Sequence, residues 1–246
     1  EIKYAGVNGD FAGMLDKESG FATYKQDFQL DVPTVEDGTQ VFLGWFIGDE
    51  QITDDRGYSL KPWNFNEVKT VTAKYVTDVL EFVWMEGEEC WSVRGGLNIK
   101  KVSTVTIPAM YEGTPVRIVG SSAFHNCTRL VVLNIPDTIT NVAADTAFTG
   151  CMRLKEVNVY DYVNKEGEDI ATQNPTYFSD EGVLMHRNET TGYTDLVYYP
   201  EVKEGAYVIS DKVTSIPLGA FARAKKVTEI TIPTSVKVIE SYAFRD

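Results

Sequence analysis

The sequence predicts a mainly β protein in which a small domain precedes a solenoid of stacked repeats. The first observation is a recurrence, because Phe124 and Phe148 are 24 residues apart, and so are Cys127 and Cys151. The second is the return of the same Ala-Phe pattern at residues 220–221 and 243–244. A fixed period in the twenties is typical of solenoids, in which one repeat cannot bury its apolar face alone and neighbouring repeats must stack.

Residues 1–76 differ from the rest because polar, glycine-punctuated loops separate short β-rich runs. The segment 28–32 alternates between apolar and polar residues, and the run 41–46 is rich in β-branched and aromatic residues. The segment 68–76 alternates again. These patterns are typical of strands, so we expect a separate β domain over residues 1–76.

A hairpin is expected at the entrance to the repeats. Residues 79–85 form a strand-like run, Glu86-Gly87-Glu88-Glu89 a polar turn, and residues 90–93 a return strand. Such a hairpin would cover the open edge of the first coil, since an uncovered edge invites pairing with another chain. We expect residues 77–104 to be this lead-in and cap, within a repeat domain that spans 77–246.

The repeat pattern is interrupted between about residues 160 and 205. Phe148 and Phe221 are 73 residues apart, close to three periods, yet no Ala-Phe pair falls between them. Residues 182–185 and 196–200 are instead predicted to be two strands joined by a polar turn, which would form an inserted β-hairpin. The loop 160–178 is expected to leave the solenoid.

The repeats resemble a known family. Over about residues 79–246 the chain resembles the BspA-type leucine-rich repeat. The resemblance rests on the order of its patterns, which is Ile-Pro, then Val/Ile-x-x-Val/Ile, then Ala-Phe, then Cys, then Leu-x-x-Leu/Val. Residues 1–76 resemble the internalin B-repeat family through the segments 42–46 and 71–75 and through Asn8-Gly9. The resemblances imply a right-handed leucine-rich-repeat solenoid with a hairpin N-terminal cap, preceded by a β-grasp-like module.

The resemblance also implies a function. It implies a secreted or cell-surface bacterial protein that acts in adhesion or recognition, with a host or bacterial surface protein or a glycan as its partner. The alternative is a structural spacer or stalk that presents another part of a larger surface protein. A monomer is expected.

Catalysis is not expected. The two histidines, His125 and His186, lack metal-ligand spacing with each other or with a cysteine. Cys127 lies two residues from His125, but no third group is placed to orient the pair. The acidic turn 54–57 does not match the spacing of an EF-hand loop, and we expect a solvated turn there. No catalytic residue, cofactor or metal site is therefore predicted.

Outward strand positions are the candidate binding residues. Alternate side chains of a strand point to opposite faces, so if Leu133 and Ile135 point inward, Asn134 points outward. Thr106, Asn134, Asn158 and Thr231 are expected to share one column, with further positions beside it. The full candidate set is Thr106, Val131, Val132, Asn134, Lys155, Glu156, Asn158, Glu229 and Thr231. The alternative is a plain solvated face, because the column lacks the aromatic anchors of most binding hot spots.

Composition excludes some partners. The net charge is −13 with no basic stripe, which argues against nucleic acid and anionic membrane surfaces. No stretch reaches the roughly 18 to 20 consecutive apolar residues of a membrane span. The chain lacks an initiator Met and stops in mid-repeat at Ala243-Phe244, so we expect a piece of a longer protein that is truncated at its C-terminal end.

Cys127 and Cys151 occupy the same position in adjacent repeats, and Cys90 has no obvious mate. Stacked coils lie about 4.8 Å apart, so a disulfide is geometrically possible. A ladder of small buried thiols is the alternative that we favour.

Overall fold

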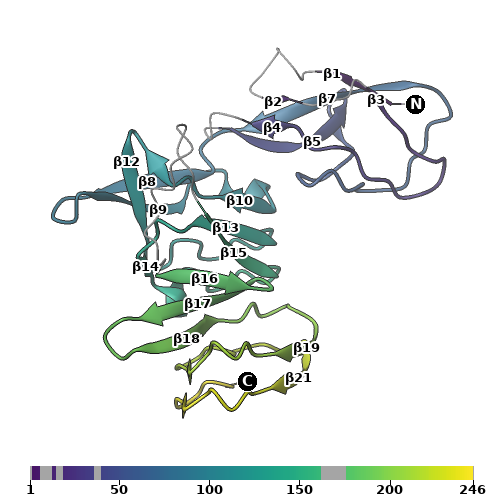
Figure 1. Ribbon diagram of the computed structural model, residues 1–246. Coiled ribbons are helices and arrows are strands. Elements are labelled where there is room, and N and C mark those ends of the chain that lie inside the picture. Colours follow the sequence, from purple (N-terminus) through teal and green to yellow (C-terminus); the bar gives the residue numbers. More distant parts are fainter. Residues whose placement is uncertain (1, 6–12, 15–18, 36–39, 162–175, 246) are drawn as a thin grey trace. The chain divides into compact units, whose positions relative to one another are not determined.

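A computed structural model describes residues 2–5, 13–14, 19–35, 40–161 and 176–245 (Figure 1). The protein is mainly β, and its chain divides into two compact units. The first comprises residues 1–79 and 96–104, and the second residues 80–95 and 105–246. The predicted boundary after residue 76 assigned the segment 96–104 to the repeats, whereas in the structure this segment packs with the first unit.

The first unit is built on a five-stranded sheet of order β3-β1-β7-β5-β6. Its strands are β1 (Ile2–Ala5), β3 (Ser19–Gly20), β5 (Val41–Ile47), β6 (Glu50–Gln51) and β7 (Lys69–Val76). β1 runs parallel to β7, and β5 runs antiparallel to it. A separate pair is formed by β2 (Gly13–Met14) and β4 (Thr34–Val35). The resemblance of this unit to the internalin B-repeat family stays a prediction.

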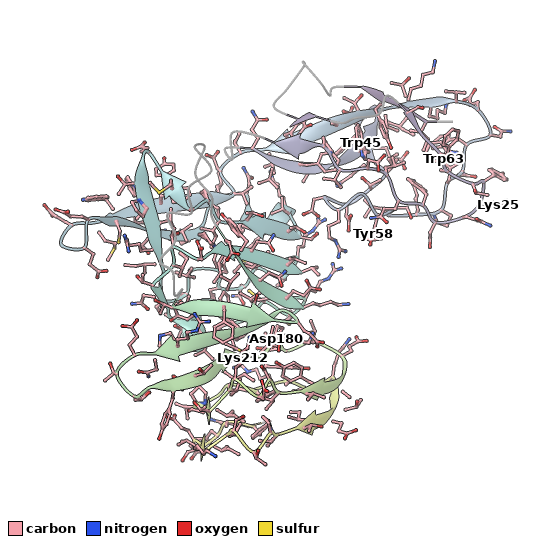
Figure 2. The ribbon with its side chains drawn as sticks, in the orientation of Figure 1. Lys25, Trp45, Tyr58, Trp63, Asp180 and Lys212 are labelled. Atoms are coloured by element: carbon pink, nitrogen blue, oxygen red, sulfur yellow. The ribbon has the colours of Figure 1, made fainter. Side chains whose placement is uncertain are left out.

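Trp45 is the centre of the first unit's core. It is fully buried, its ring stacks on Tyr4, and its indole N–H donates to the Asp31 carbonyl at 2.9 Å. Figure 2 shows Trp45 and Trp63 within this unit, and both are buried.

The predicted strand over residues 28–32 is wrong. Its backbone pairs instead with the turn at 57–59, where Leu30 N–H donates to the Gly57 carbonyl and Ser59 N–H to the Phe28 carbonyl. These bonds hold the segment without a continuous ladder, so only an isolated bridge forms there.

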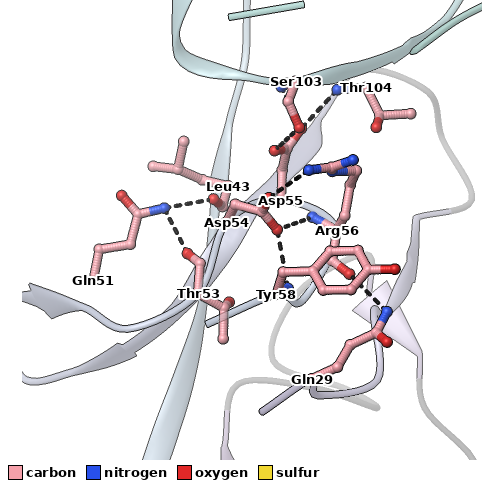
Figure 3. Close-up of polar contacts among 10 residues, drawn as sticks. All are labelled: Gln29, Leu43, Gln51, Thr53, Asp54, Asp55, Arg56, Tyr58, Ser103 and Thr104. Carbon is pink, nitrogen blue, oxygen red and sulfur yellow. Dashed lines mark hydrogen bonds and ion pairs between the residues drawn. The ribbon is translucent and has the colours of Figure 1, made fainter. Parts of the chain in front are cut away.

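The turn expected to be solvated at residues 54–57 contains a buried carboxylate. Asp55 is 6 % exposed and accepts hydrogen bonds from the backbone N–H and the hydroxyl of Ser103, each at 2.5 Å, and from the Thr104 N–H at 2.8 Å (Figure 3). The neighbouring Asp54 accepts from the N–H groups of Arg56 and Tyr58. Both carboxylates are therefore used to hold the chain, and Asp55 ties the segment 96–104 to the turn.

The second unit is a solenoid whose coils alternate between two walls. One wall contains β10 (Thr104–Thr106), β13 (Val132–Pro136) and β15 (Glu156–Tyr160), followed by β19 (Gly205–Val208) and β21 (Val227–Thr231). The other contains β11 (Met110–Tyr111), β12 (Thr114–Val119) and β14 (Asn141–Val142). The predicted cap is confirmed as β8 (Leu80–Met85) paired antiparallel with β9 (Cys90–Gly95), and β9 covers the edge of β12 in parallel.

The repeat period sets the strand register. Leu133 lies beside Val157 and Ile135 beside Val159 in the parallel pair β13–β15, so residues 24 apart are neighbours. Leu133, Ile135 and Val157 are completely buried between the walls. This register confirms the stacked solenoid predicted from the spacing.

Aromatic rings stack along the edge where each coil turns. Phe124 and Phe148 lie 6.4 Å apart between ring centroids, and Phe221 and Phe244 lie 4.9 Å apart. In two of the coils the Phe N–H donates to the alanine carbonyl of the next coil, from Phe124 to Ala147 and from Phe221 to Ala243. A short helix, α1 (Ala144–Ala147), forms one of these turns.

The predicted inserted hairpin is confirmed and is extended by one strand. β17 (Val183–Asn188) pairs antiparallel with β18 (Tyr193–Tyr198), and β16 (Tyr177–Asp180) pairs with the other side of β17. β18 then pairs in parallel with β20 (Ser215–Ile216), and β20 with β22 (Val238–Ile239), which returns the chain to the repeats. Most of the predicted loop 160–178 lies outside the described residues.

None of the three cysteines forms a disulfide, and all three are buried. The Cys151 thiol donates to the Phe124 carbonyl at 3.0 Å. A hydrogen bond with the Cys127 thiol, together with burial, raises the pKa of Cys151 well above its ordinary value. The two thiols therefore form the predicted ladder of small buried side chains, and the high pKa keeps Cys151 protonated and unreactive.

Candidate functional site

The candidate site is the outer face of β10, β13 and β15, which we call the polar strand face. Alternation along these strands points Val105, Leu133 and Val157 into the core, where they are buried. The intervening side chains point outward, so Thr106 is exposed and Asn134 is half-buried. The face is therefore polar, and it is held on a sheet whose other side is the hydrophobic core.

Three of the predicted residues form a hydrogen-bonded ladder. The Asn134 side-chain N–H₂ donates to the Thr106 hydroxyl at 3.0 Å, and the Asn158 side-chain N–H₂ donates to the Asn134 side-chain oxygen at 3.3 Å. Asn158 also lies 3.3 Å from a carboxylate oxygen of Glu156. Each amide thus has its orientation fixed by the neighbouring strand.

The ladder ends at Asn158, because no strand of the described residues extends this sheet beyond β15. The backbone N–H of Val157 instead donates to the carbonyl of Gly182 in the β16–β17 turn, and the N–H of Val159 donates to the hydroxyl of Ser179 in β16. Gly182 has φ +77°, and a Cβ built there would lie 2.8 to 3.0 Å from atoms of Glu156. Only glycine therefore lets this turn approach β15 so closely.

Two parts of the predicted site lie elsewhere. Val131 is 5 % exposed and precedes β13, where its carbonyl accepts the N–H of Lys155, so its side chain is not outward. Thr231 pairs with Val208 in the separate sheet β19–β21, together with Glu229, and does not extend the ladder from Asn158. The inserted strands separate the two groups, which a uniform repeat spacing could not indicate.

Charged side chains of both signs accompany the strands. Lys155 and Glu156 are exposed on β15 or just before it. Further along the solenoid, Lys226 lies 2.6 Å from Glu204 and, with a smaller contribution from Lys155, lowers the pKa of that carboxyl. These charges balance one another locally, so this part of the surface favours neither strongly acidic nor strongly basic partners.

The histidines do not form a catalytic arrangement in the described part of the chain. His125 is exposed, whereas Cys127 is buried with its thiol directed at the His125 carbonyl rather than the ring. His186 packs on the Tyr177 ring and lies 3.7 Å from Asp195. No group of three or more metal-ligating side chains and no helix long and apolar enough to cross a membrane occurs among the described residues.

The chain is similar to several solved structures described as leucine-rich or leucine-rich-repeat proteins. A Treponema pallidum leucine-rich-repeat protein is 20 % identical, with 68 % of this chain and 64 % of that chain covered and a TM-score of 0.42. A leucine-rich cell surface protein from Faecalibacterium prausnitzii is 17 % identical, with 69 % and 73 % covered and a TM-score of 0.29. A Bacteroides ovatus leucine-rich-repeat protein is 19 % identical, with 66 % and 42 % covered and a TM-score of 0.37. The chain thus spans less than two-thirds of the T. pallidum and B. ovatus proteins.

The family comparison covers the solenoid. No curated protein shows significant similarity to the sequence. Six copies of the BspA type Leucine rich repeat region match residues 98–174 and 201–246, together half of the chain. The gap between the two matched ranges contains β17 and β18, the strands that interrupt the repeats. The chain belongs to the BspA-type leucine-rich-repeat family.

Proposed function

We propose that this chain is a non-catalytic binding module of an exported bacterial protein, placed outside the cell or on its surface. In this proposal it mediates adhesion by recognising a host or bacterial surface protein, or a glycan, through the polar strand face. A rigid solenoid suits this task because it offers many weak contacts on an extended surface that does not rearrange.

The observation that carries the proposal is the Thr106–Asn134–Asn158 ladder. Its amides are held in one orientation by hydrogen bonds across strands. Ordering a long polar side chain on binding costs about 0.5–1.5 kcal/mol, and a side chain that is already ordered avoids that cost. The ladder therefore presents polar groups at the strand spacing of about 4.8 Å, ready to pair with an equally regular polar ligand.

The test is a binding screen of the protein against purified host matrix proteins and a glycan array. The variant Asn134→Arg/Asn158→Arg places two bulky cations on the polar strand face. The matched control is Asn141→Arg, because Asn141 is an exposed strand asparagine on the opposite wall. We expect the double variant to lose binding by at least tenfold while the control keeps it. Equal binding by all three folded proteins would exclude the polar strand face.

A spacer function is the second candidate, and one observation favours it. The ladder amides already satisfy one another, and the burial of Val131 removes an apolar contact from the face. Fewer groups then remain to bind a partner. A folded parent protein that binds no member of the panel would support the spacer over the adhesive module.

A further inference from the structure

The cap hairpin carries a group of aromatic side chains on one face of its sheet. Trp84 of β8 lies directly opposite Trp91 of β9, with 5.1 Å between their ring centroids. Tyr111 of β11 joins them, because its ring lies 5.1 Å from Trp91 and stacks on Phe82 at 4.0 Å. All four residues belong to the second unit. This packing holds the Trp84 ring in one orientation.

Trp84 is the most exposed ring of this group. It is 44 % exposed, whereas Phe82, Trp91 and Tyr111 are half-buried. Trp84 lines an open cleft of about 370 Å³ together with the turn that joins β8 to β9. Figure 1 shows this turn projecting away from the stacked coils. We call the cleft the hairpin tip, and its lining residues are Trp84, Glu86, Gly87, Glu88 and Glu89.

Three carboxylates of the hairpin tip have no counter-charge in the described part of the chain. Glu86, Glu88 and Glu89 are all exposed, and none of them forms an ion pair with a described residue. Burial raises the pKa of the Cys90 thiol, and Glu88 adds to this rise while Arg117 opposes it. One guanidinium therefore lies in the neighbourhood of Glu88, and three carboxylates outweigh it.

An exposed tryptophan beside unpaired carboxylates favours a cation as the ligand. The face of a tryptophan ring attracts cations, and the attraction grows when the cation has lost its water. A quaternary ammonium group loses water easily because it has no N–H to donate, whereas a lysine ammonium is strongly hydrated. Its methyl groups also cover apolar ring surface, and the carboxylates attract its charge without direct contact.

We propose that the hairpin tip binds a small organic cation with a quaternary ammonium group, which lies on the exposed surface of Trp84 while Glu86, Glu88 and Glu89 supply the counter-charge. The cleft volume falls in the range of about 300–1,000 Å³ that is usual for small-molecule sites. A phosphate ester of the same cation binds less well, because its phosphate meets the carboxylates of the turn. The hairpin tip and the polar strand face lie on different sheets, so this proposal is independent of the function proposed above.

The experiment compares choline with its neutral isostere 3,3-dimethylbutan-1-ol and with phosphocholine, by saturation-transfer NMR and calorimetric titration at pH 7. Trp84→Ala removes the ring, and Trp84→Phe keeps a smaller one. Glu88→Gln/Glu89→Gln removes two carboxylates and keeps the size of the side chains. The matched control is Glu189→Gln/Asp211→Asn, which removes two exposed negative charges elsewhere in the same unit.

We expect the parent to bind choline at least about fivefold more tightly than the neutral isostere, because only the cation is attracted by the ring and the carboxylates. Trp84→Ala should weaken choline binding by about fivefold or more, and Trp84→Phe by less, because phenylalanine attracts cations more weakly than tryptophan does. Glu88→Gln/Glu89→Gln should weaken it by about threefold and reduce the loss of affinity that about 0.5 M salt causes in the parent. The control should bind choline as the parent does.

Circular dichroism verifies that each variant is folded. The proposal is overturned if the parent does not bind choline at millimolar concentration, or if choline binds no better than the neutral isostere or phosphocholine. It is also overturned if Trp84→Ala binds choline as tightly as the parent, or if the control weakens binding as much as Glu88→Gln/Glu89→Gln.

Discussion

Phe148→Ala tests whether the stacked rings hold the solenoid together. Phe148 is 2 % exposed, and its ring lies between those of Phe124 and Tyr198, at centroid distances of 6.4 and 4.8 Å. Removing a fully enclosed phenyl group loses its transfer free energy and leaves a cavity, so we expect the free energy of unfolding to fall by about 3–5 kcal/mol.

The same repeat position in the last described coil provides the control. Phe244 is 43 % exposed, and its described ring contact is with Phe221. Nearly half of this residue already faces solvent and no enclosed cavity would form, so Phe244→Ala should cost about 1–2 kcal/mol.

The assay is urea unfolding followed by far-UV circular dichroism, with the m-values of parent and variants compared so that a change in the unfolding mechanism is recognised. Equal losses of stability in the two variants, or a larger loss for Phe244→Ala, would refute the argument that enclosure between neighbouring coils sets the contribution of each ring.

Three further predictions concern other parts of the molecule. Gly182→Ala should lower the free energy of unfolding by clearly more than the roughly 1–2 kcal/mol that left-handed backbone strain alone costs, because the alanine Cβ would also meet Glu156. Gly192 has φ +70° and open space around its Cα, so Gly192→Ala measures the backbone strain by itself in the same urea titration. Asp55→Ala should destabilise the first unit by about 3 kcal/mol or more in thermal unfolding, since it leaves buried donors of Ser103 without their acceptor; an unchanged melting temperature would contradict this. Burial raises the pKa of the Tyr207 hydroxyl above the ordinary value of about 10. The unfolded chain therefore loses the Tyr207 proton at a lower pH than the native protein does, and the free energy of unfolding should fall as the pH rises above about 10. A free energy of unfolding that stays constant in urea titrations between pH 7 and 11.5 would rule this out.

The repeats could be predicted because residues at a fixed spacing become neighbours in space. The 24-residue period placed Leu133 beside Val157, and the alternation of side chains placed Asn134 and Asn158 on the outer face. The cap hairpin followed from two β-rich runs around a polar turn. In each case a local pattern and a regular stack specify the same arrangement.

Other features depend on contacts that no local pattern records. β1 has only four residues, and it becomes a strand because β7 offers a parallel edge. Asp55 lies in an acidic turn typical of solvent, yet it is buried by a segment almost fifty residues later in the chain. Val131 and Val132 are identical in the sequence, so nothing local distinguishes them. β13 begins at Val132, and Val131, which precedes the strand, is buried.

The interrupted coil explains both the limit of the polar strand face and the space left at the edge where the rings stack. On one wall the β16–β17 turn replaces the strand that would continue from β15, so the ladder of amides stops at Asn158. On the edge, β18 reaches Tyr199 without the turn that regular coils make, so space remains between neighbouring turns. The tyrosine preserves the backbone bond and the ring stacking of the missing phenylalanine, which keeps the coils on both sides in contact. A regular repeat at this place would lengthen the polar strand face and fill the space at the edge, so one departure from the period determines the shape of both.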